Sequence, residues 1–289
     1  MTTEPDTGAP TVHTEEHDGV LVITIDRPKV RNAVDGATAR ALADAFDQLD
    51  SHDDLMVGVL TGAGGTFSAG MDLKAFAKGD TPVLPGRGFA GLTRTRLHTP
   101  LIAAVEGWAL GGGTEMALAC DLIVAAENAT FGLTEVTFGL VPPEGGIVRL
   151  PERIPRNIAV EILLTGEPLP AERAHQLGLV NHLTPPGETL TKAVELAHRI
   201  ARNAPLSISA VRRSTSGRRT ATRTHSASRT NSSHRSSLPR RAGRSPCLRR
   251  KAPTPLGRPL TPAPRGPRGA PPQPVGPAGR QGTTRTPRG

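Results

Sequence analysis

Short apolar runs alternate with segments of helical periodicity along the first two-thirds of the chain. Residues 20–25 (VLVITI) are apolar or β-branched throughout, which is typical of a buried strand. Residues 34–49 place apolar side chains on one helical face behind Asp35, a suitable N-cap. Further strands are predicted at 55–60, 101–105 and 122–126, and further helices at 114–119, 157–164, 171–177 and 190–204. This alternation predicts an α/β fold with a mainly parallel sheet and right-handed crossovers.

The pattern changes abruptly near residue 213. The 289 residues include 35 basic and 26 acidic ones, a net charge of +9, but residues 1–213 carry a net charge of −8. From Ser214 onward the chain has 16 Arg, one Lys, 13 of the 28 prolines, and neither acidic nor aromatic residues. Such a segment buries too little apolar surface to offset the entropy of ordering. We predict a disordered N-terminus (1–18), a globular domain (19–213) and a disordered Arg/Pro-rich C-terminal tail (214–289).

Composition also argues against several classes of protein. No apolar run approaches the ~20 residues that span a bilayer, and the N-terminal MTTEPDTGAP lacks the hydrophobic stretch of a secretory signal. The only cysteines, Cys120 and Cys247, make no disulfide framework, so we expect a cytoplasmic protein without membrane contact. The nine histidines show no paired metal-ligand spacing, and no metal site is expected.

Two glycine-rich turns each lie between an apolar strand and a helix. They are Phe67–Leu73 (FSAGMDL) and Gly111–Glu115 (GGGTE). If both faced one cleft, their backbone N–H groups would form a pair of donors for a developing oxyanion. The alternative is a plain strand-to-helix connection with no ligand. Neither turn has the form of a phosphate loop or a dinucleotide-binding motif.

Two glutamates, Glu115 and Glu135, are flanked by apolar residues. Burial brings a carboxyl pKa toward neutrality, so a pair of such groups is suited to general acid–base catalysis. The alternative is that each is an acid at a helix start, where the helix dipole favours negative charge. The spacing leaves open whether the two side chains meet.

The order of these segments resembles the crotonase superfamily, and within it the enoyl-CoA hydratases. The resemblance covers roughly residues 18–213. Each motif is weak alone, but the ordered set is specific. The matching stretches are Asp26–Lys29, Asn32-Ala33, Thr61-Gly62, Phe67–Leu73, Pro100–Val105, Gly107–Glu115, Cys120-Asp121, Phe131-Gly132 with Glu135, Gly139–Pro142, Leu164–Gly166 and Gly178–Asn181.

The resemblance implies a crotonase-like spiral of ββα turns that binds acyl-CoA and assembles as a homotrimer or hexamer. It assigns the oxyanion-hole donors to the backbone N–H groups of Ala69 and Gly112. It assigns the activation of water to Glu115 and protonation of the α-carbon to Glu135. The implied substrate-binding residues are Ala69, Gly70, Met71, Asp72 and Gly112. No separate cofactor is implied, because coenzyme A is part of the substrate.

Keeping both glutamates favours hydration of a 2-enoyl-CoA, since family members that isomerise double bonds often lack one. Enoyl-CoA isomerisation stays open as an alternative. A finer resemblance, on Gly88–Thr93 and Gly145-Gly146 with Arg149–Pro151, is to the carnitinyl-CoA dehydratase (crotonobetainyl-CoA hydratase) branch. Glu144 would then face a cationic group on the substrate; otherwise it is a solvated loop residue.

The chain departs from the family beyond Ala204–Ser207, where the family continues into helices that cover the site and build the trimer interface. Three interpretations of residues 214–289 stay open. The reading frame shifts near Arg213; or a basic arm binds nucleic acid or another polyanion non-specifically through phosphate contacts; or the product is an inactive remnant. Reading the DNA around codon 213 in the other two frames distinguishes the first interpretation from the others.

Overall fold

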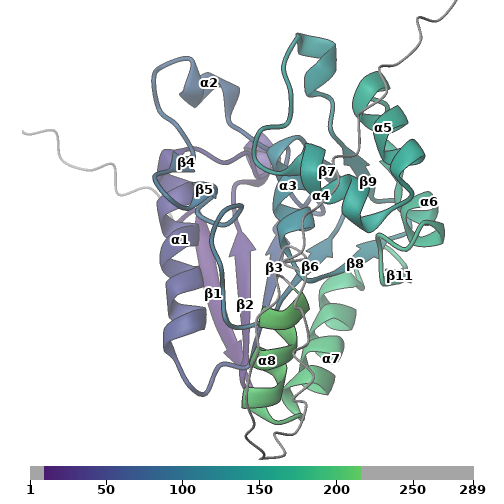
Figure 1. The fold of residues 1–289 in the computed structure, drawn as a ribbon. Coiled ribbons are helices and arrows are strands. Elements are labelled where there is room, and N and C mark those ends of the chain that lie inside the picture. Colours follow the sequence, from purple (N-terminus) through teal and green to yellow (C-terminus); the bar gives the residue numbers. More distant parts are fainter. Residues whose placement is uncertain (1–9, 216–289) are drawn as a thin grey trace, which may run out of the picture. The chain divides into compact units, whose positions relative to one another are not determined.

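A computed structural model describes residues 10–215 of the chain (Figure 1). The predictions made for residues 1–9 and 216–289, including nearly all of the Arg/Pro-rich tail, lie outside the described residues.

A six-stranded sheet forms the centre of the described region. Its strand order is β1 (Val12–His17), β2 (Val20–Ile25), β3 (Val57–Gly62), β6 (Leu101–Val105), β8 (Leu122–Ala126) and β11 (His182–Thr184). Only the β1–β2 pair is antiparallel; the other four pairs are parallel. The predicted α/β fold with a mainly parallel sheet is confirmed.

Strand β1 contradicts the predicted disorder for residues 12–17, whereas residues 1–9 lie outside the described part of the chain. It pairs with β2 along its whole length, from Val12 opposite Ile25 to His17 opposite Val20. Its last four side chains are exposed, so the ladder of backbone hydrogen bonds stabilises it without the apolar pattern that marks a buried strand. A sequence signal was present nonetheless: Asp18-Gly19, both at positive φ, is the turn that a two-residue hairpin requires.

Helices cover both faces of this sheet (Figure 1). Leu21, Ile23 and Ile25 of β2 share one apolar cluster with helix α1 (Gly36–Ser51). The alternate residues of the strand pack instead in the cluster of α7 (Thr189–Ala201). This alternation follows from the two-residue period of a strand, which a continuously apolar sequence satisfies on both faces. Asp35 caps α1 as predicted, accepting from Thr38 N–H at 2.8 Å.

A second, smaller sheet positions the segments that carry Glu115 and Glu135. It has the order β10 (Leu169–Pro170), β9 (Thr130–Gly132) and β7 (Trp108–Leu110), with β7 and β9 parallel. Strand β6 leads through β7 into α3 (Gly112–Ala119), and β8 leads through β9 into the 3-10 helix η2 (Glu135–Phe138). Each passage runs from strand to strand to helix, the second helix being of the 3-10 type, which agrees with the ββα turns of the predicted crotonase-like spiral.

Residues 79–91 are rich in glycine and proline, a composition that predicts a mobile surface loop, and the structure contradicts this prediction. It contains the hairpin β4 (Val83–Leu84) and β5 (Gly88–Phe89), and the Phe89 and Ala90 side chains are 3% and 0% exposed. Glycines and prolines suggested a loop, but they frame apolar residues that pack in the core.

The remaining elements complete the described region. They are η1 (Pro28–Val30), α2 (Leu73–Phe76), α4 (Gly146–Arg153), α5 (Arg156–Thr165), α6 (Ala171–Gln176) and α8 (Pro205–Thr215). Helix α8 continues past the predicted boundary at residue 213. Between residues 10 and 215, no helix is long and apolar enough to cross a bilayer.

Candidate active site

The two glycine-rich turns lie against one another. Ser68 forms a parallel bridge with Ala109 of β7, which brings the segment after β3 beside the start of α3. A Cβ atom on Gly70 would lie 2.6 Å from the carbonyl oxygen of Leu110 and 3.0 Å from the nitrogen of Gly112. Gly70 also has φ +85°, so both the space and the backbone conformation require glycine. The two turns, whose meeting the sequence left open, therefore lie in contact.

Gly112 supplies the first N–H of α3, after the N-cap Gly111. The first N–H groups of a helix lack acceptors within that helix and carry partial positive charge. A Cβ atom on Gly112 would lie 2.6 Å from the Phe89 ring, so a side chain at this position would collide with the 88–94 segment. The N–H of Gly112 is thus a backbone donor at a position where only glycine fits beside Phe89.

Ala69, the other predicted donor, is already engaged. Its N–H donates to the carbonyl oxygen of Arg31 at 2.9 Å, which contradicts its assignment as a free oxyanion donor. The N–H of Met71, two residues further on, is not engaged in this way. Val34 bonds to Gly70 O and to Asp72 N, so the N–H of Met71 points away from Val34. Among residues 10–215, no acceptor reaches the Met71 N–H.

Successive N–H groups of an extended segment point to opposite sides, so the bridge between Val34 and Met71 shows that the Met71 N–H is the available donor. The sequence motif alone does not show that Val34 is the bridging partner.

The two glutamates come together at the ends of adjacent strands. Leu110 of β7 is opposite Gly132 of β9, and because the strands are parallel the segments that follow leave on the same side. Glu115 lies on α3 and Glu135 begins η2. A Cβ atom on Gly111 would lie 3.2 Å from Glu135 Oε1, which places that carboxylate at the N-terminus of α3.

Glu115 is buried, with 1% of the residue exposed. Its Oε1 accepts hydrogen bonds from the N–H groups of Glu144 at 2.8 Å and Gly146 at 2.9 Å. Burial raises its pKa to about 7, and the negative charges of Glu135 and Glu144 add to the shift. A carboxyl with this pKa can both accept and release a proton near neutral pH.

Glu135 is half-buried, and burial raises its pKa as well. Its Oε2 is a buried oxygen with no hydrogen-bond partner among residues 10–215. Buried carboxyl oxygens are normally paired, so an unpaired one beside a second carboxyl and a helix N-terminus is an acceptor or donor position for a ligand.

Asp72, predicted to line the substrate path, uses its carboxylate within the protein. It caps α2 by accepting from the N–H groups of Lys74 and Ala75, both at 3.1 Å. It also pairs with Arg27 at 3.2 Å, and Arg27 pairs with Asp35 at 2.8 Å. The side chain of Asp72 therefore fixes the turn that carries Gly70 and Met71.

Glu144 is buried, which excludes its interpretation as a solvated loop residue. It accepts from three donors of the 88–94 segment, one of which is the guanidinium of Arg94 at 2.7 Å. The described residues hold no group of three or more His, Cys, Asp or Glu side chains suited to a metal.

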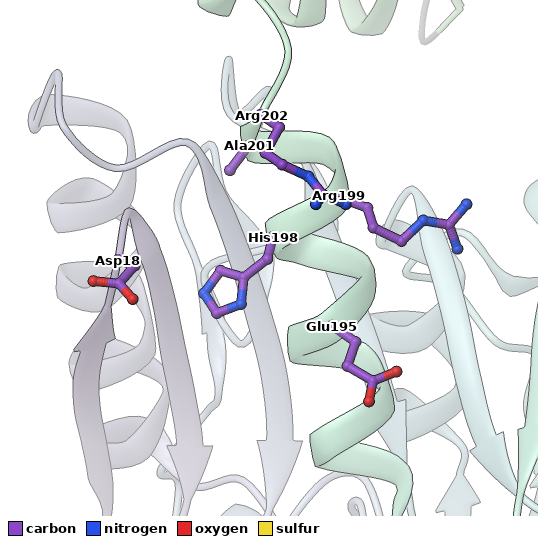
Figure 2. Close-up of a pocket in the computed structure, with 6 residues that line it drawn as sticks. All are labelled: Asp18, Glu195, His198, Arg199, Ala201 and Arg202. Atoms are coloured by element: carbon purple, nitrogen blue, oxygen red, sulfur yellow. The ribbon is translucent and has the colours of Figure 1, made fainter.

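A separate pocket lies on another part of the molecule (Figure 2). It runs along α7 beside the turn between β1 and β2, and its lining shares no residue with the glutamate pair. Its residues are Asp18, Glu195, His198, Arg199, Ala201 and Arg202.

Comparison with known proteins agrees with this geometry. The family model described as enoyl-CoA hydratase/isomerase matches residues 15–244. Carnitinyl-CoA dehydratases of Salmonella typhi and Salmonella agona are 45% identical over 206 residues, which is 70% of this chain and 78% of theirs.

Solved structures show the same similarity. An enoyl-CoA hydratase from Mycobacterium tuberculosis H37Rv is 57% identical with a TM-score of 0.70, covering 71% of this chain and 81% of that one. A carnitinyl-CoA dehydratase from Mycobacterium avium 104 is 47% identical with a TM-score of 0.70, covering 72% and 82%.

Proposed function

This chain belongs to the enoyl-CoA hydratase/isomerase family, and from that premise we propose that it adds water across the 2,3 double bond of a 2-enoyl-CoA thioester. The observation that carries the proposal is the pair Glu115 and Glu135, two carboxyls with raised pKa values beside the N-terminus of α3. Coenzyme A arrives with the substrate, so the reaction needs no resident cofactor.

The backbone N–H groups of Gly112 and Met71 bind the thioester oxygen. As water attacks, electrons move from the double bond toward this carbonyl, and negative charge develops on its oxygen. Two fixed donors and the positive end of α3 stabilise that charge, and loss of one such donor typically costs about 3 kcal/mol of transition-state stabilisation. Gly70 allows the two donors to approach, because a side chain there would collide with Leu110 and Gly112.

The two glutamates divide the remaining chemistry. Ionised Glu115 orients the water and takes one of its protons as the oxygen bonds to the β-carbon. Protonated Glu135 delivers a proton to the α-carbon, so the substrate gains one water molecule in total. Burial raises the pKa of Glu115 to about 7 and also raises that of Glu135, the direction that proton exchange by a carboxyl requires.

Hydration of crotonyl-CoA by the full chain tests the proposal. We expect Glu115→Gln and Glu135→Gln each to lower kcat by about 10²–10⁴-fold with little change in KM, because the carboxyls act on the transition state. Circular dichroism controls for folding. Parent-like turnover by both variants would contradict the assignment, and turnover of a 3-enoyl-CoA in place of crotonyl-CoA would favour isomerisation.

A second candidate is the interconversion of carnitinyl-CoA and crotonobetainyl-CoA, since several similar proteins carry that name. The charge of Glu144 does not favour it. That carboxylate is compensated by Arg94 and two further donors, so it offers no unpaired negative charge to a trimethylammonium group. The ratio of kcat/KM for crotonobetainyl-CoA and crotonyl-CoA decides between the two substrates.

The proposed enzyme is a homotrimer or a hexamer. Large apolar side chains are exposed together on and around η2, α4 and α5, and exposed patches of this kind mark association surfaces. They are Val136, Phe138, Leu140, Val141, Ile147, Val148 and Leu164. Light scattering of the purified chain tests the oligomeric state.

We also propose a cytoplasmic location, which suits Cys120, a free and buried thiol.

A further inference from the structure

The side chain of Glu144 is a buried anion outside the proposed proton transfers. It lies between η2 and α4 and is 6% exposed. Its Oε2 accepts from Phe89 N–H at 3.2 Å and Thr93 Oγ1 at 2.9 Å, and its Oε1 accepts from Arg94 Nη2 at 2.7 Å. All three donors belong to the 88–94 segment. A carboxylate is buried at acceptable cost only with such partners.

The backbone of the same residue contacts Glu115. The N–H of Glu144 and the N–H of Gly146 both donate to Glu115 Oε1, at 2.8 and 2.9 Å. No donor from residues 10–215 reaches the other carboxyl oxygen, Oε2. One oxygen of Glu115 is therefore fixed by the 144–146 backbone, and the other is left for water.

Further contacts hold the 88–94 and 144–146 segments together. Arg149 of α4 donates to the carbonyl oxygen of Glu144 at 2.9 Å and also to the carbonyl oxygen of Thr93. Gly88 lies so close that a Cβ atom would be 2.7 Å from Glu144 Oε2, and its φ is +76°. The backbone of the 88–94 segment is thus shaped around the Glu144 carboxylate.

We propose that Glu144 is a positioning residue for Glu115: its carboxylate, held by the 88–94 segment, fixes the two backbone N–H groups that orient the water-activating side chain. This inference rests on the proposed function for its kinetic consequence. The charged groups near Glu115 are Glu135 on η2 and Glu144 itself, with Arg94 and Arg149 on the far side of Glu144.

Steady-state kinetics across pH with crotonyl-CoA test this role. Glu144→Ala should lower kcat by about tenfold or more and change KM by less than about threefold, because orientation matters most in the transition state. Glu144→Gln keeps an acceptor for Phe89 and Thr93 and should recover most of kcat. It should also move the pH dependence assigned to Glu115 to lower pH, since a repelling charge is gone. Glu152→Ala on α4, exposed in the structure, is the matched control and should behave as the parent.

An NMR titration separates this inference from the proposed function, because it needs no substrate. In the parent, the amide signals of Glu144 and Gly146 should follow the titration of Glu115. In Glu144→Ala the Gly146 amide should lose that response, while in Glu152→Ala it should keep it. An unchanged Gly146 response in Glu144→Ala overturns the inference.

If Glu144→Ala does not fold, Thr93→Val removes one donor to the Glu144 carboxylate and should weaken the same Gly146 response. An unchanged response in Thr93→Val also overturns the inference. A parent that fails to hydrate crotonyl-CoA overturns only the proposed function.

Discussion

The six-stranded sheet and the segments that follow β7 and β9 bury different kinds of side chain: apolar ones in the sheet, carboxyls in the segments. In the sheet, the side chains of β2 alternate between two apolar clusters, and the backbone groups of the strands are paired in ladders. In the segments after β7 and β9, the protein buries Glu115 and Glu144, and Glu135 Oε2 has no hydrogen-bond partner among residues 10–215. Burial of apolar side chains stabilises the sheet, whereas burial of carboxyls costs free energy and raises the pKa values of Glu115 and Glu135.

The largest expected effect is on catalysis with both carboxyls removed. Because Glu115 and Glu135 act on one event, the double variant Glu115→Gln/Glu135→Gln should lose about 10²–10⁴ in kcat, within about tenfold of the worse single variant. Its free energy of unfolding should not fall. Kinetics and urea unfolding of the same preparation measure both. Fully additive losses would show that the two groups act independently.

A substitution in the core beside the sheet should have the opposite effect, lowering stability and not kcat. Phe46 of α1 is fully buried in the main apolar cluster. Phe46→Ala should lower the free energy of unfolding by about 3–5 kcal/mol, through lost burial and the cavity left behind. The kcat of the protein that stays folded should be close to that of the parent. A loss of kcat in excess of the unfolded fraction would show that the core and the loops are coupled.

The pH dependence of stability sharpens the contrast. Burial raises the pKa of Glu115 from 4.5 to about 7 in the folded state. A carboxyl with a raised folded-state pKa contributes its full stability below the unfolded-state pKa and loses it as pH rises to about 7. Glu115→Gln should therefore be more stable than the parent by up to roughly 3 kcal/mol near pH 8. That gain should shrink toward pH 4, which urea unfolding at several pH values checks; a gain independent of pH would refute this cause.

The smallest effect is expected at the cap of α1, on the sheet side of the molecule. Asp35 accepts from Thr38 N–H and pairs with Arg27. Asp35→Asn keeps a capping oxygen and removes the charge, whereas Asp35→Ala removes both. We expect losses of about 1 kcal/mol for alanine and less for asparagine in thermal unfolding. A kcat change in either variant would connect this cap to the Asp72 turn through Arg27.

Much of the fold followed from the sequence because its signals are local. Continuous apolar runs predicted β2, β3, β6 and β8, and Asp35 marked the start of α1. Strand β1 was missed because most of its side chains are exposed, so its stability comes from a partner strand. The 79–91 segment was missed because glycine reports backbone conformation and not burial.

The candidate site was only partly accessible from the sequence. The apolar flanks of Glu115 and Glu135 indicated burial, and the structure brings the two together. The choice between Ala69 and Met71 as donor depends on which backbone groups bond to Arg31 and Val34, and those residues lie more than thirty positions earlier in the chain. The burial of Glu144 depends likewise on the distant donors Phe89, Thr93 and Arg94.

Strand β1 has a consequence for the behaviour of the chain in concentrated solution. It lies at one end of the sheet order, and its exposed residues include Glu15 and Glu16. An edge strand offers unpaired backbone groups to any passing extended peptide, and like charges along it disfavour such pairing between copies. The strand at the other end, β11, is only three residues long. Both edges of the sheet thus discourage edge-to-edge aggregation, so this protein should resist forming fibres more than its apolar inner strands would suggest.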